Sequence, residues 1–341
     1  AFDGRRSGGL PGAWFFLPAL QARVEPDGGL RITATLRVRP DESAPALARR
    51  WRAAFETPAP TAPPRWPLCL AVRDSSAAAF RAAVRRALAG IAHRDLDKVV
   101  CSRTRTFTFE RAVPPALLLQ AVEVASAGAV VTAIGRPGEA VWVGASPERL
   151  VRRTGNRIET MALAGTDAPG AERALLASDK ARREHELVAA AIERALAPVA
   201  RACRRRSGPE VVALPGLRHL RTEIEARAHG RPHVLEIAAR LHPTPAVCGQ
   251  PREAAWRWLA GERAEERGWY TGAVGTVQPG GDGELFVLLR CLVARGRRLR
   301  LHAGAGIVAG SCPEAEWRET ERKLAALARA LEIGARQEVA T

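Results

Sequence analysis

The chain has 341 residues, of which 47% are hydrophobic, so it can bury a large core within one domain or two. Its formal net charge is +16, but the arginines are scattered along the whole chain, and the longest run is Arg204 to Arg206. No stretch approaches the roughly 18 apolar residues of a membrane helix. We therefore expect a globular protein that binds neither nucleic acid nor membrane and whose charge attracts an anionic small molecule.

The six cysteines are widely spaced and include no CxxC pair, a pattern typical of reduced thiols in a chain of this length. This usage predicts a cytoplasmic location. At the amino end, Arg5 and Arg6 precede a short apolar stretch over 8–22 that is superficially like a twin-arginine export signal. Pro11 and Pro18 interrupt that stretch, so we expect it to form a first strand of the fold.

Alternating apolar residues over 31–39 predict a half-buried strand, and a proline-rich loop over 57–67 and a helix over 76–92 follow it. Farther along, turn residues between apolar runs predict three hairpins, which are 130–135 with 140–146, 150–153 with 157–163, and 284–294 with 298–304. Further helices are expected near 178–202, 250–262 and 314–333. Hairpins that alternate with long helices indicate an α+β architecture.

Lysine is rare in this chain. Of 52 basic residues, only Lys98, Lys180 and Lys323 are lysines. Arginine stays protonated at any workable pH, whereas lysine can act as a neutral base when it is desolvated, or as a compact point charge. Each lysine is therefore a candidate for a role that arginine cannot fill.

Two carboxylates and one of these lysines share a direction on the helix expected over 314–333. Glu316, Glu319 and Lys323 are spaced i, i+3 and i+7. Taken alone, Glu319 and Lys323 match an ordinary ion pair on the surface of a helix. A glycine-rich segment directly upstream, from about Gly304, offers backbone N–H groups to a ligand's carboxylate, and this combination favours a functional site.

A third carboxylate, Glu184, lies next to His185 inside the helix expected over 178–202. Taken alone, it matches an ordinary solvated glutamate on a helix. A metal site needs a second carboxylate from a distant segment, for which Glu319 is the candidate, and Mg2+ prefers such oxygen ligands. Zinc and nucleophilic serine are not indicated, because the sequence contains no HExxH motif, no Cys/His cluster and no GxSxG motif.

Together these segments resemble the chorismate-utilising enzymes, the family of isochorismate, salicylate, anthranilate and aminodeoxychorismate synthases. The resemblance is carried by motifs in order along the chain: KVVCSR at 98–103, GASPERL at 144–150, ALAGT at 162–166, SDKARREHELV at 178–188, RHLRT at 218–222, LHPTPAVCGQP at 241–251, RGWYTGAVG at 267–275, LRC at 289–291, and AGAGIVAGSCPEAEW with RETERKL at 303–324. The segment LHPTPAVCGQP resembles the corresponding segment of the isochorismate synthases. Ala164 stands where common aminodeoxychorismate synthases have a nucleophilic lysine.

The resemblance implies a single chorismate-binding domain over 1–341, with residues 1–97 loosely matched and the catalytic part at 98–333. Its fold would be two stacked, mainly antiparallel β-sheets flanked by helices. The implied substrate is chorismate, with no obligatory glutaminase subunit, in a monomer or homodimer. The downstream pathway, whether menaquinone, a siderophore or another salicylate-derived product, stays open.

Residue by residue, the resemblance implies that Lys98 is the general base that activates water and that Glu148 is the acid that protonates the departing hydroxyl. Glu184 and Glu319 match the Mg2+ ligands, and Glu316 would assist them through water or as an outer contact. The residues that would line the substrate pocket are Gly165, Thr166, His219, Arg290, Gly304 and Lys323.

The implied reaction is the Mg2+-dependent conversion of chorismate to isochorismate, in which water attacks C2 and the C4 hydroxyl leaves. Water must lose a proton as it attacks, so Lys98 has to be available in its neutral form, which burial or a cationic neighbourhood favours. Hydroxide leaves poorly, so Glu148 must stay protonated near neutrality, which requires an apolar or negatively charged setting.

Other activities remain open. A salicylate synthase would use the same site and then eliminate pyruvate, and an anthranilate synthase component I would add ammonia, commonly with a glutaminase partner. A catalytically silent homologue or a basic nucleic-acid-binding protein on this fold is a further alternative. Two features depart from the family pattern: the loop between ALAGT and SDK is short, and Ala181 stands where an acidic residue often follows the lysine.

Overall fold

The computed structural model describes residues 12–18, 20–24, 30–34, 43–46, 48–49, 65–126, 128–136, 138–167, 170, 172–214, 217–262 and 267–336. By its internal contacts the chain divides into two compact units, residues 13–64 and the remainder. A single chorismate-binding domain over 1–341 stays a prediction.

In the smaller unit, β1 (Leu20–Val24) pairs antiparallel with β2 (Leu30–Ala34). The strand predicted over 31–39 is thus confirmed for 31–34, and its remaining residues lie outside the described part. The first strand predicted within 8–22 coincides with β1 only at 20–22. Of the proline-rich segment at 57–67, only 65–67 are described, and these have no regular secondary structure.

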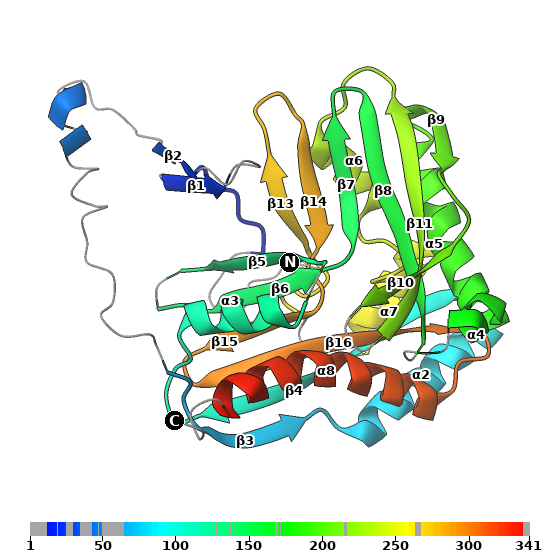
Figure 1. Cartoon of the computed structure of the whole chain (residues 1–341). Coiled ribbons are helices and arrows are strands. Elements are labelled where there is room, and N and C mark those ends of the chain that lie inside the picture. Colours follow the sequence, from blue (N-terminus) through cyan, green and yellow to red (C-terminus); the bar gives the residue numbers. More distant parts are fainter. Residues whose placement is uncertain are drawn as a thin grey trace. The chain divides into compact units, whose positions relative to one another are not determined.

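Seven strands form the first sheet of the larger unit, and every neighbouring pair is antiparallel (Figure 1). In spatial order they are β10 (Glu210–Leu214), β11 (Leu217–Ala228), β8 (Arg157–Asp167), β7 (Arg149–Thr154), β14 (Gly283–Val287) and β13 (Ala273–Val277), with β9 (Ala200–Arg205) also paired to β11.

Seven more strands form the second sheet, again with antiparallel neighbours. Their order is β12 (Gly249–Gln250), β4 (Lys98–Phe109), β16 (Arg298–Val308), β15 (Cys291–Arg295), β6 (Val141–Ser146) and β5 (Val130–Gly135), with β3 (Cys69–Asp74) also paired to β4. In Figure 1 the first sheet stands above the second. The predicted fold of two antiparallel sheets flanked by helices is confirmed.

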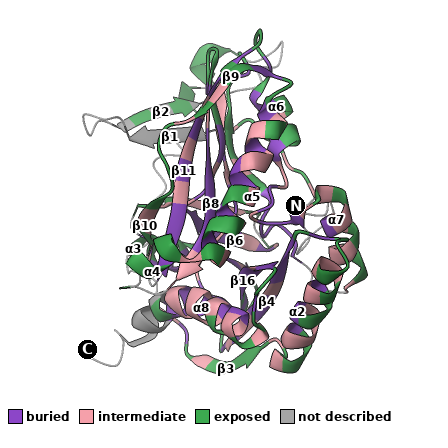
Figure 2. Cartoon of the chain, turned by 90° about the vertical axis from the view of Figure 1, so that its right-hand side faces the viewer, coloured by how far each residue is buried: buried purple, intermediate pink, exposed green. Residues whose placement is uncertain are grey.

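Helices cover the outer faces of both sheets because each has one apolar stripe. Against the first sheet lie α4 (Glu172–Ala177), α5 (Asp179–Leu196) and α6 (Val234–Leu241). Against the second lie α2 (Ala77–Ala92), α3 (Pro115–Val124), α7 (Arg252–Gly261) and α8 (Pro313–Arg336). Figure 2 shows burial concentrated along β4, β8, β11 and β16, the central strands beneath these helices. None of the described helices is long and apolar enough to cross a membrane.

Two predicted elements were wrong in extent. The helix expected over 178–202 ends at Leu196, because Ala200–Arg205 pairs with β11 as β9. The run at 284–294 is two strands rather than one: Phe286 pairs with Arg149 in the first sheet, and Cys291 pairs with Gly144 in the second. The chain changes sheets between them, and the other two predicted hairpins are confirmed.

Candidate functional site

A cavity of about 80 Å3 lies where the two sheets meet α5 and α8. It is lined by nine of the predicted site residues, which are Glu148, Gly165, Thr166, Glu184, His219, Arg290, Gly304, Glu319 and Lys323. Lys98 and Glu316 do not line it. Lys98 is bonded to Glu184, and Glu316 is bonded to Lys180. The structure therefore brings together site residues as far apart in the chain as Glu148 and Lys323.

At two of the places where the chain passes from one sheet to the other, the connection carries a site residue. Glu148 lies between β6 and β7, and Arg290 lies between β14 and β15. The crossings are tied together, because Val287 donates its N–H to the carbonyl of Glu148 at 3.0 Å and Ala145 donates to the carbonyl of Arg290 at 3.2 Å. Arg290 has φ of 46°, a strained value for a non-glycine residue, as the chain turns here.

Lys98 is the first residue of β4 and is completely buried. Its Nζ donates to Oε1 of Glu184 on α5 at 2.9 Å. Burial alone would raise the pKa of Glu184, but the Lys98 ammonium outweighs it, with help from the charges of Lys180 and Lys323, so this pKa lies below its usual value. Glu184 is therefore an anion at neutral pH, beside the proposed base.

Glu319 and Lys323 form the predicted i, i+4 pair at 2.7 Å, but the pair is not on the surface. Their side chains are only 13% and 16% exposed and face the cavity. Nζ of Lys323 also donates to the carbonyl of Gly304 on β16 at 2.8 Å. This second bond anchors α8 to the strand and fixes the position of the ammonium.

Glu148 has the setting that a catalytic acid requires. Its side chain is buried, and burial raises its pKa to about 8, against the charge of Lys98 and the Thr244 hydroxyl, which both lower it. The carboxyl is consequently protonated at neutral pH. Loss of solvent supplies the apolar setting expected from the sequence.

His219 connects two other pocket residues. Arg290 can only donate, so its bond to Nε2 of His219 at 3.1 Å makes that nitrogen an acceptor and leaves the proton on Nδ1. Nδ1 then donates to Oγ1 of Thr166 at 3.1 Å. Burial first, and then the charges of Arg290 and Lys323, hold the pKa of His219 well below its usual value, so the ring is neutral.

Arg290 is the cation best placed for an anionic ligand. Burial lowers its pKa to about 10, which still leaves it charged at neutral pH. Its bond to His219 uses one of five guanidinium N–H groups, so others can bind a carboxylate. Beside it, Tyr270 and His302 also line the cavity and stack on each other with ring centroids 5.2 Å apart. These aromatic residues were missed from the sequence, although Tyr270 lies within the RGWYTGAVG motif.

Two residues outside the predicted set, His185 and Lys180, hold the site's helices. His185 bonds Oγ1 of Thr222 at 2.8 Å and the carbonyl of Ala164 at 3.2 Å, which ties α5 to β11 and β8. Lys180 bonds Oε1 of Glu316 at 2.5 Å and ties α5 to α8. Only the rarity of lysine in the sequence pointed to Lys180.

Glu184, Glu316 and Glu319 have the chemistry of a Mg2+ site, because the atoms they offer as ligands are carboxylate oxygens. Oε2 of Glu316 is buried and has no hydrogen-bond partner of normal geometry, although the Ser311 hydroxyl is close enough to lower the pKa of this carboxyl. The oxygen can therefore accept a cation in place of that weak contact. Within the described ranges, no group of three acidic, histidine or cysteine side chains forms a ready-made metal site. Each glutamate is instead bonded to a lysine.

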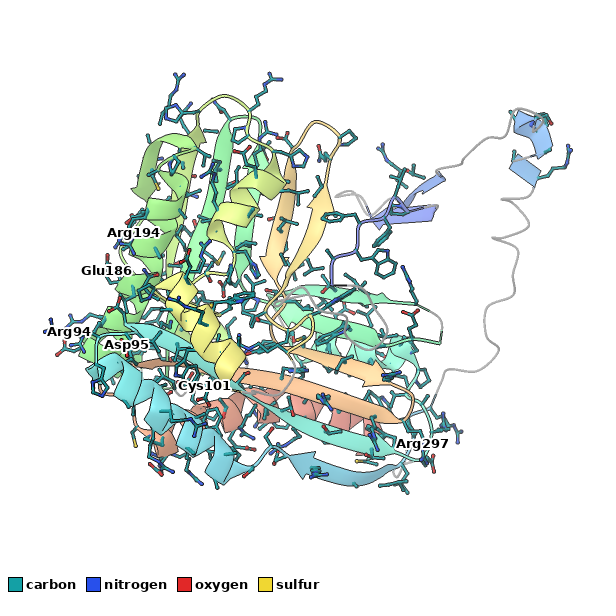
Figure 3. All side chains as sticks on the ribbon, turned by 180° about the vertical axis from the view of Figure 1, so that it is seen from behind. Arg94, Asp95, Cys101, Glu186, Arg194 and Arg297 are labelled. Atoms are coloured by element: carbon teal, nitrogen blue, oxygen red, sulfur yellow. The ribbon has the colours of Figure 1, made fainter. Side chains whose placement is uncertain are left out.

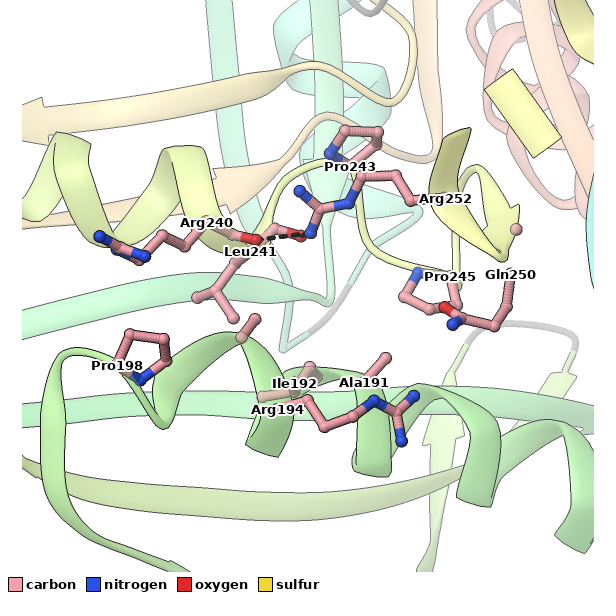
Figure 4. Close-up of a pocket in the computed structure, with 12 residues that line it drawn as sticks. Ala191, Ile192, Arg194, Pro198, Arg240, Leu241, Pro243, Pro245, Gln250 and Arg252 are labelled. Atoms are coloured by element: carbon pink, nitrogen blue, oxygen red, sulfur yellow. Dashed lines mark hydrogen bonds between the residues drawn. The ribbon is translucent and has the colours of Figure 1, made fainter. Parts of the chain in front are cut away.

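A larger cavity of about 480 Å3 lies elsewhere, between α5, α6 and the segment that precedes α7 (Figure 4). Its walls include Arg194, Arg240 and Arg252, but none of the predicted site residues. In Figure 4 the three guanidinium groups do not converge, and that of Arg252 is bonded to the carbonyls of Arg240 and Leu241. We therefore place the candidate active site in the smaller cavity.

The basic residues are spread over separate elements. Arg94 follows α2, Arg194 lies on α5, and Arg297 lies in the turn between β15 and β16, and all three are exposed (Figure 3). The cysteines Cys69, Cys101, Cys203, Cys248, Cys291 and Cys312 are free thiols, in agreement with the reduced state expected from their spacing.

Comparison with known proteins agrees with this geometry. The family model described as chorismate binding enzyme matches residues 3–332. The chain belongs to the chorismate-binding enzymes. It is 37% identical over 257 residues to the isochorismate synthase EntC of Escherichia coli K12, an alignment that covers 73% of this chain and 66% of EntC. The chain thus spans just under two thirds of the length of this curated relative.

Solved structures share this fold. MenF, the menaquinone-specific isochorismate synthase from Escherichia coli, matches with a TM-score of 0.76 and 31% identity over 84% of this chain and 68% of that chain. Anthranilate synthase component I from Streptococcus pneumoniae also matches, with a TM-score of 0.76 over 88% of this chain and 70% of that chain. Its identity of 21% shows the common fold alone.

Proposed function

We propose that this chain is an isochorismate synthase that converts chorismate to isochorismate with Mg2+. The observation that carries the proposal is the combination of a completely buried lysine, Lys98, with a buried glutamic acid, Glu148, whose pKa is raised to about 8. These are the groups that water attack and hydroxyl departure require. The similar E. coli proteins EntC and MenF are both isochorismate synthases, which supports the same assignment.

In the proposed reaction, Lys98 first releases the proton with which it is paired to Glu184 and acts in its neutral form. Water then attacks C2 of chorismate and passes one proton to Nζ of Lys98. The ring double bond shifts, and the C4 hydroxyl departs as water with the proton of Glu148. One water enters and one leaves, so substrate and product are isomers. Solvent exchange then returns the proton from the ammonium and restores the carboxylic acid.

Other residues of the cavity bind and orient the substrate. Arg290, fixed through His219 and Thr166, would bind a substrate carboxylate with its remaining N–H groups. Lys323 and the backbone near Gly304 would contact the same part of the ligand. Gly165 lines this pocket with φ of 81°, and a Cβ there would lie only 3.1 Å from the carbonyl of Ala181, so a side chain would be both strained and crowded.

Glu184 and Glu319 would hold Mg2+, with Glu316 assisting. Bound there, the cation would offset the negative charge of the substrate and keep its carboxylate in register. Because water rather than ammonia is the nucleophile, we expect the chain to work without a glutaminase.

Product analysis tests this proposal against its relatives. Purified protein is incubated with chorismate and Mg2+, and the products are separated by chromatography, with Lys98→Ala as the control. Isochorismate from the wild type and none from the variant is the expected result. Accumulation of salicylate and pyruvate would assign a salicylate synthase instead, and nitrogen incorporation from ammonium would assign an anthranilate-type enzyme.

A further inference from the structure

All three lysines of the chain are bonded to glutamates of the proposed cation site, each to a different one. The pairs are Lys98 with Glu184 at 2.9 Å, Lys180 with Glu316 at 2.5 Å, and Lys323 with Glu319 at 2.7 Å. In the resting site, before Lys98 gives up its proton, three carboxylates and three ammonium groups therefore balance in charge. Lys98 and Lys323 already have proposed roles in proton transfer and substrate binding, whereas Lys180 has none.

Lys180 lies at a position that is unfavourable for a cation. Ser178 caps α5, so Lys180 is the second residue of the helix, where the helix dipole repels positive charge. Its bond to Glu316 must compensate for this repulsion and for the fixing of a long side chain. The placement therefore indicates a function for Lys180 at Glu316 rather than within α5.

The two partners differ in their access to solvent. The side chain of Lys180 is 35% exposed, whereas that of Glu316 is 1% exposed. Burial and the neighbouring Glu319 raise the pKa of Glu316, and Lys180 opposes both. Lys180 can move its ammonium toward solvent and regain hydration there. Glu316 cannot leave the interior, so its carboxylate needs a cation close by.

We propose that Lys180 is a positioning residue that neutralises Glu316 when no metal is bound and competes with Mg2+ for this carboxylate, so that its charge sets the metal affinity of the site. This inference rests on the proposed function, because it assumes that Mg2+ binds beside Glu184 and Glu319. With all three lysines in place, a bound Mg2+ leaves the cluster with two excess positive charges until the dianionic substrate arrives. Lys180 thereby favours metal binding together with substrate over metal binding alone.

The test measures Mg2+ binding to chorismate-free protein by titration calorimetry, with Lys180→Met as the variant. Loss of the ammonium should lower the Kd for Mg2+ by roughly tenfold, because one charge that repels the cation is gone. The same variant should melt at a lower temperature without Mg2+ and regain most of that loss with saturating Mg2+. Lys180→Arg restores the charge and should bind Mg2+ much as the wild type does.

Two further variants locate the effect. Arg182→Met removes a cation from the exposed side of the same helix turn, where Arg182 is paired with Asp179, and should change neither Kd nor melting temperature. In a Glu316→Gln background, Lys180→Met should no longer tighten Mg2+ binding, because the carboxylate for which the ammonium competes is absent. Lys180→Gln serves in place of Lys180→Met if the latter does not fold.

The outcomes separate this inference from the proposed function. If wild-type protein binds Mg2+ and Lys180→Met binds it equally or more weakly, Lys180 is only a structural tether between α5 and α8, and the inference is wrong. Wild-type protein that binds no Mg2+, with or without chorismate, would overturn the metal assignment itself and the inference with it. If Lys180→Met tightened Mg2+ binding just as much in the Glu316→Gln background, this result would also contradict competition for Glu316.

Discussion

Lys98 and Glu184 approach each other directly over Gly306 of β16. Nζ of Lys98 lies 2.9 Å from Oε1 of Glu184, and a Cβ added at Gly306 would overlap that oxygen and come within 2.8 Å of Cε of Lys98. The glycine at this position therefore makes the closeness of the Lys98 ammonium and the Glu184 carboxylate sterically possible.

Gly306→Ala should separate this pair. The added methyl group must displace the Glu184 carboxylate, which is 14% exposed, or the Lys98 side chain, which is completely buried. We expect kcat to fall by roughly tenfold or more, because misplaced catalytic groups lose orientation. Steady-state kinetics and thermal melting measure the effect. Gly261→Ala on α7, where a Cβ would meet nothing within 4 Å, is the matched control, and an equal loss in that variant would contradict the steric account.

Lys98 should tolerate neither removal nor replacement by arginine. Lys98→Met lacks the base, and Lys98→Arg keeps a cation that cannot give up its proton. Both should lower kcat by roughly a hundredfold to ten-thousandfold, the usual contribution of a general base. The measurement is the initial rate with saturating chorismate and Mg2+. Turnover by Lys98→Arg close to that of the wild type would show that the residue supplies only charge.

The pH dependence of kcat/KM should follow the protonation of Glu148. As a general acid it acts in its protonated form, which is present below its pKa of about 8 and is lost above it. The ratio kcat/KM should therefore fall as pH rises through about 8, with a tenfold loss for each further unit. Glu148→Gln should be slow throughout and lack this decline. A wild-type profile that stays level well above this pH would remove Glu148 from the acid role.

The same shift affects folding stability. The folded-state pKa of Glu148 lies above the usual value of 4.5, so the folded protein holds its proton more tightly than the unfolded chain does. This contribution is complete below pH 4.5 and is lost as pH rises through about 8. Denaturant unfolding at a series of pH values should show a smaller decline across this range in Glu148→Gln than in the wild type.

Arg103 should hold α8 on the second sheet. Its guanidinium lies 3.7 Å from the ring centroid of Trp317 and donates to Thr320 at 2.7 Å and to Glu321 at 2.6 Å. Arg103→Met should lower the free energy of unfolding by about 1–3 kcal/mol, through loss of buried hydrogen bonds and the cation–π contact. Urea denaturation measures this difference. Arg111→Met, at a more exposed ion pair, should change it little.

The sequence predicted those parts of the fold whose signals are local. Alternation and turn residues identified the β5–β6 and β7–β8 hairpins, and helical spacing placed Glu316, Glu319 and Lys323 in one direction. The break at 288–290 was missed, because a continuous apolar run is the same for one buried strand and for two that lie in different sheets. The crossing that positions Arg290 depends on pairing with strands far away in the chain.

The motifs predicted residues that the structure places around one cavity, but they did not predict the contacts between those residues. Motif resemblance identified Glu184 and Lys98 as site residues without indicating that they bond to each other. The bond between Lys180 and Glu316 joins residues that are 136 positions apart in sequence and lie on different helices. No local sequence pattern encodes such a contact. Likewise, the raised pKa of Glu148 follows from burial by distant segments, which only the folded structure reveals.

Isotope labelling tests the central claim most directly, because the proposed reaction takes the new C2 hydroxyl of isochorismate from solvent. The enzyme is given chorismate and Mg2+ in water enriched in oxygen-18, and isochorismate from the early reaction is analysed by mass spectrometry with fragmentation. The account predicts oxygen-18 in the C2 hydroxyl of the wild-type product and no product from Lys98→Ala. Unlabelled isochorismate, formed by transfer of the substrate's own C4 hydroxyl, would contradict it.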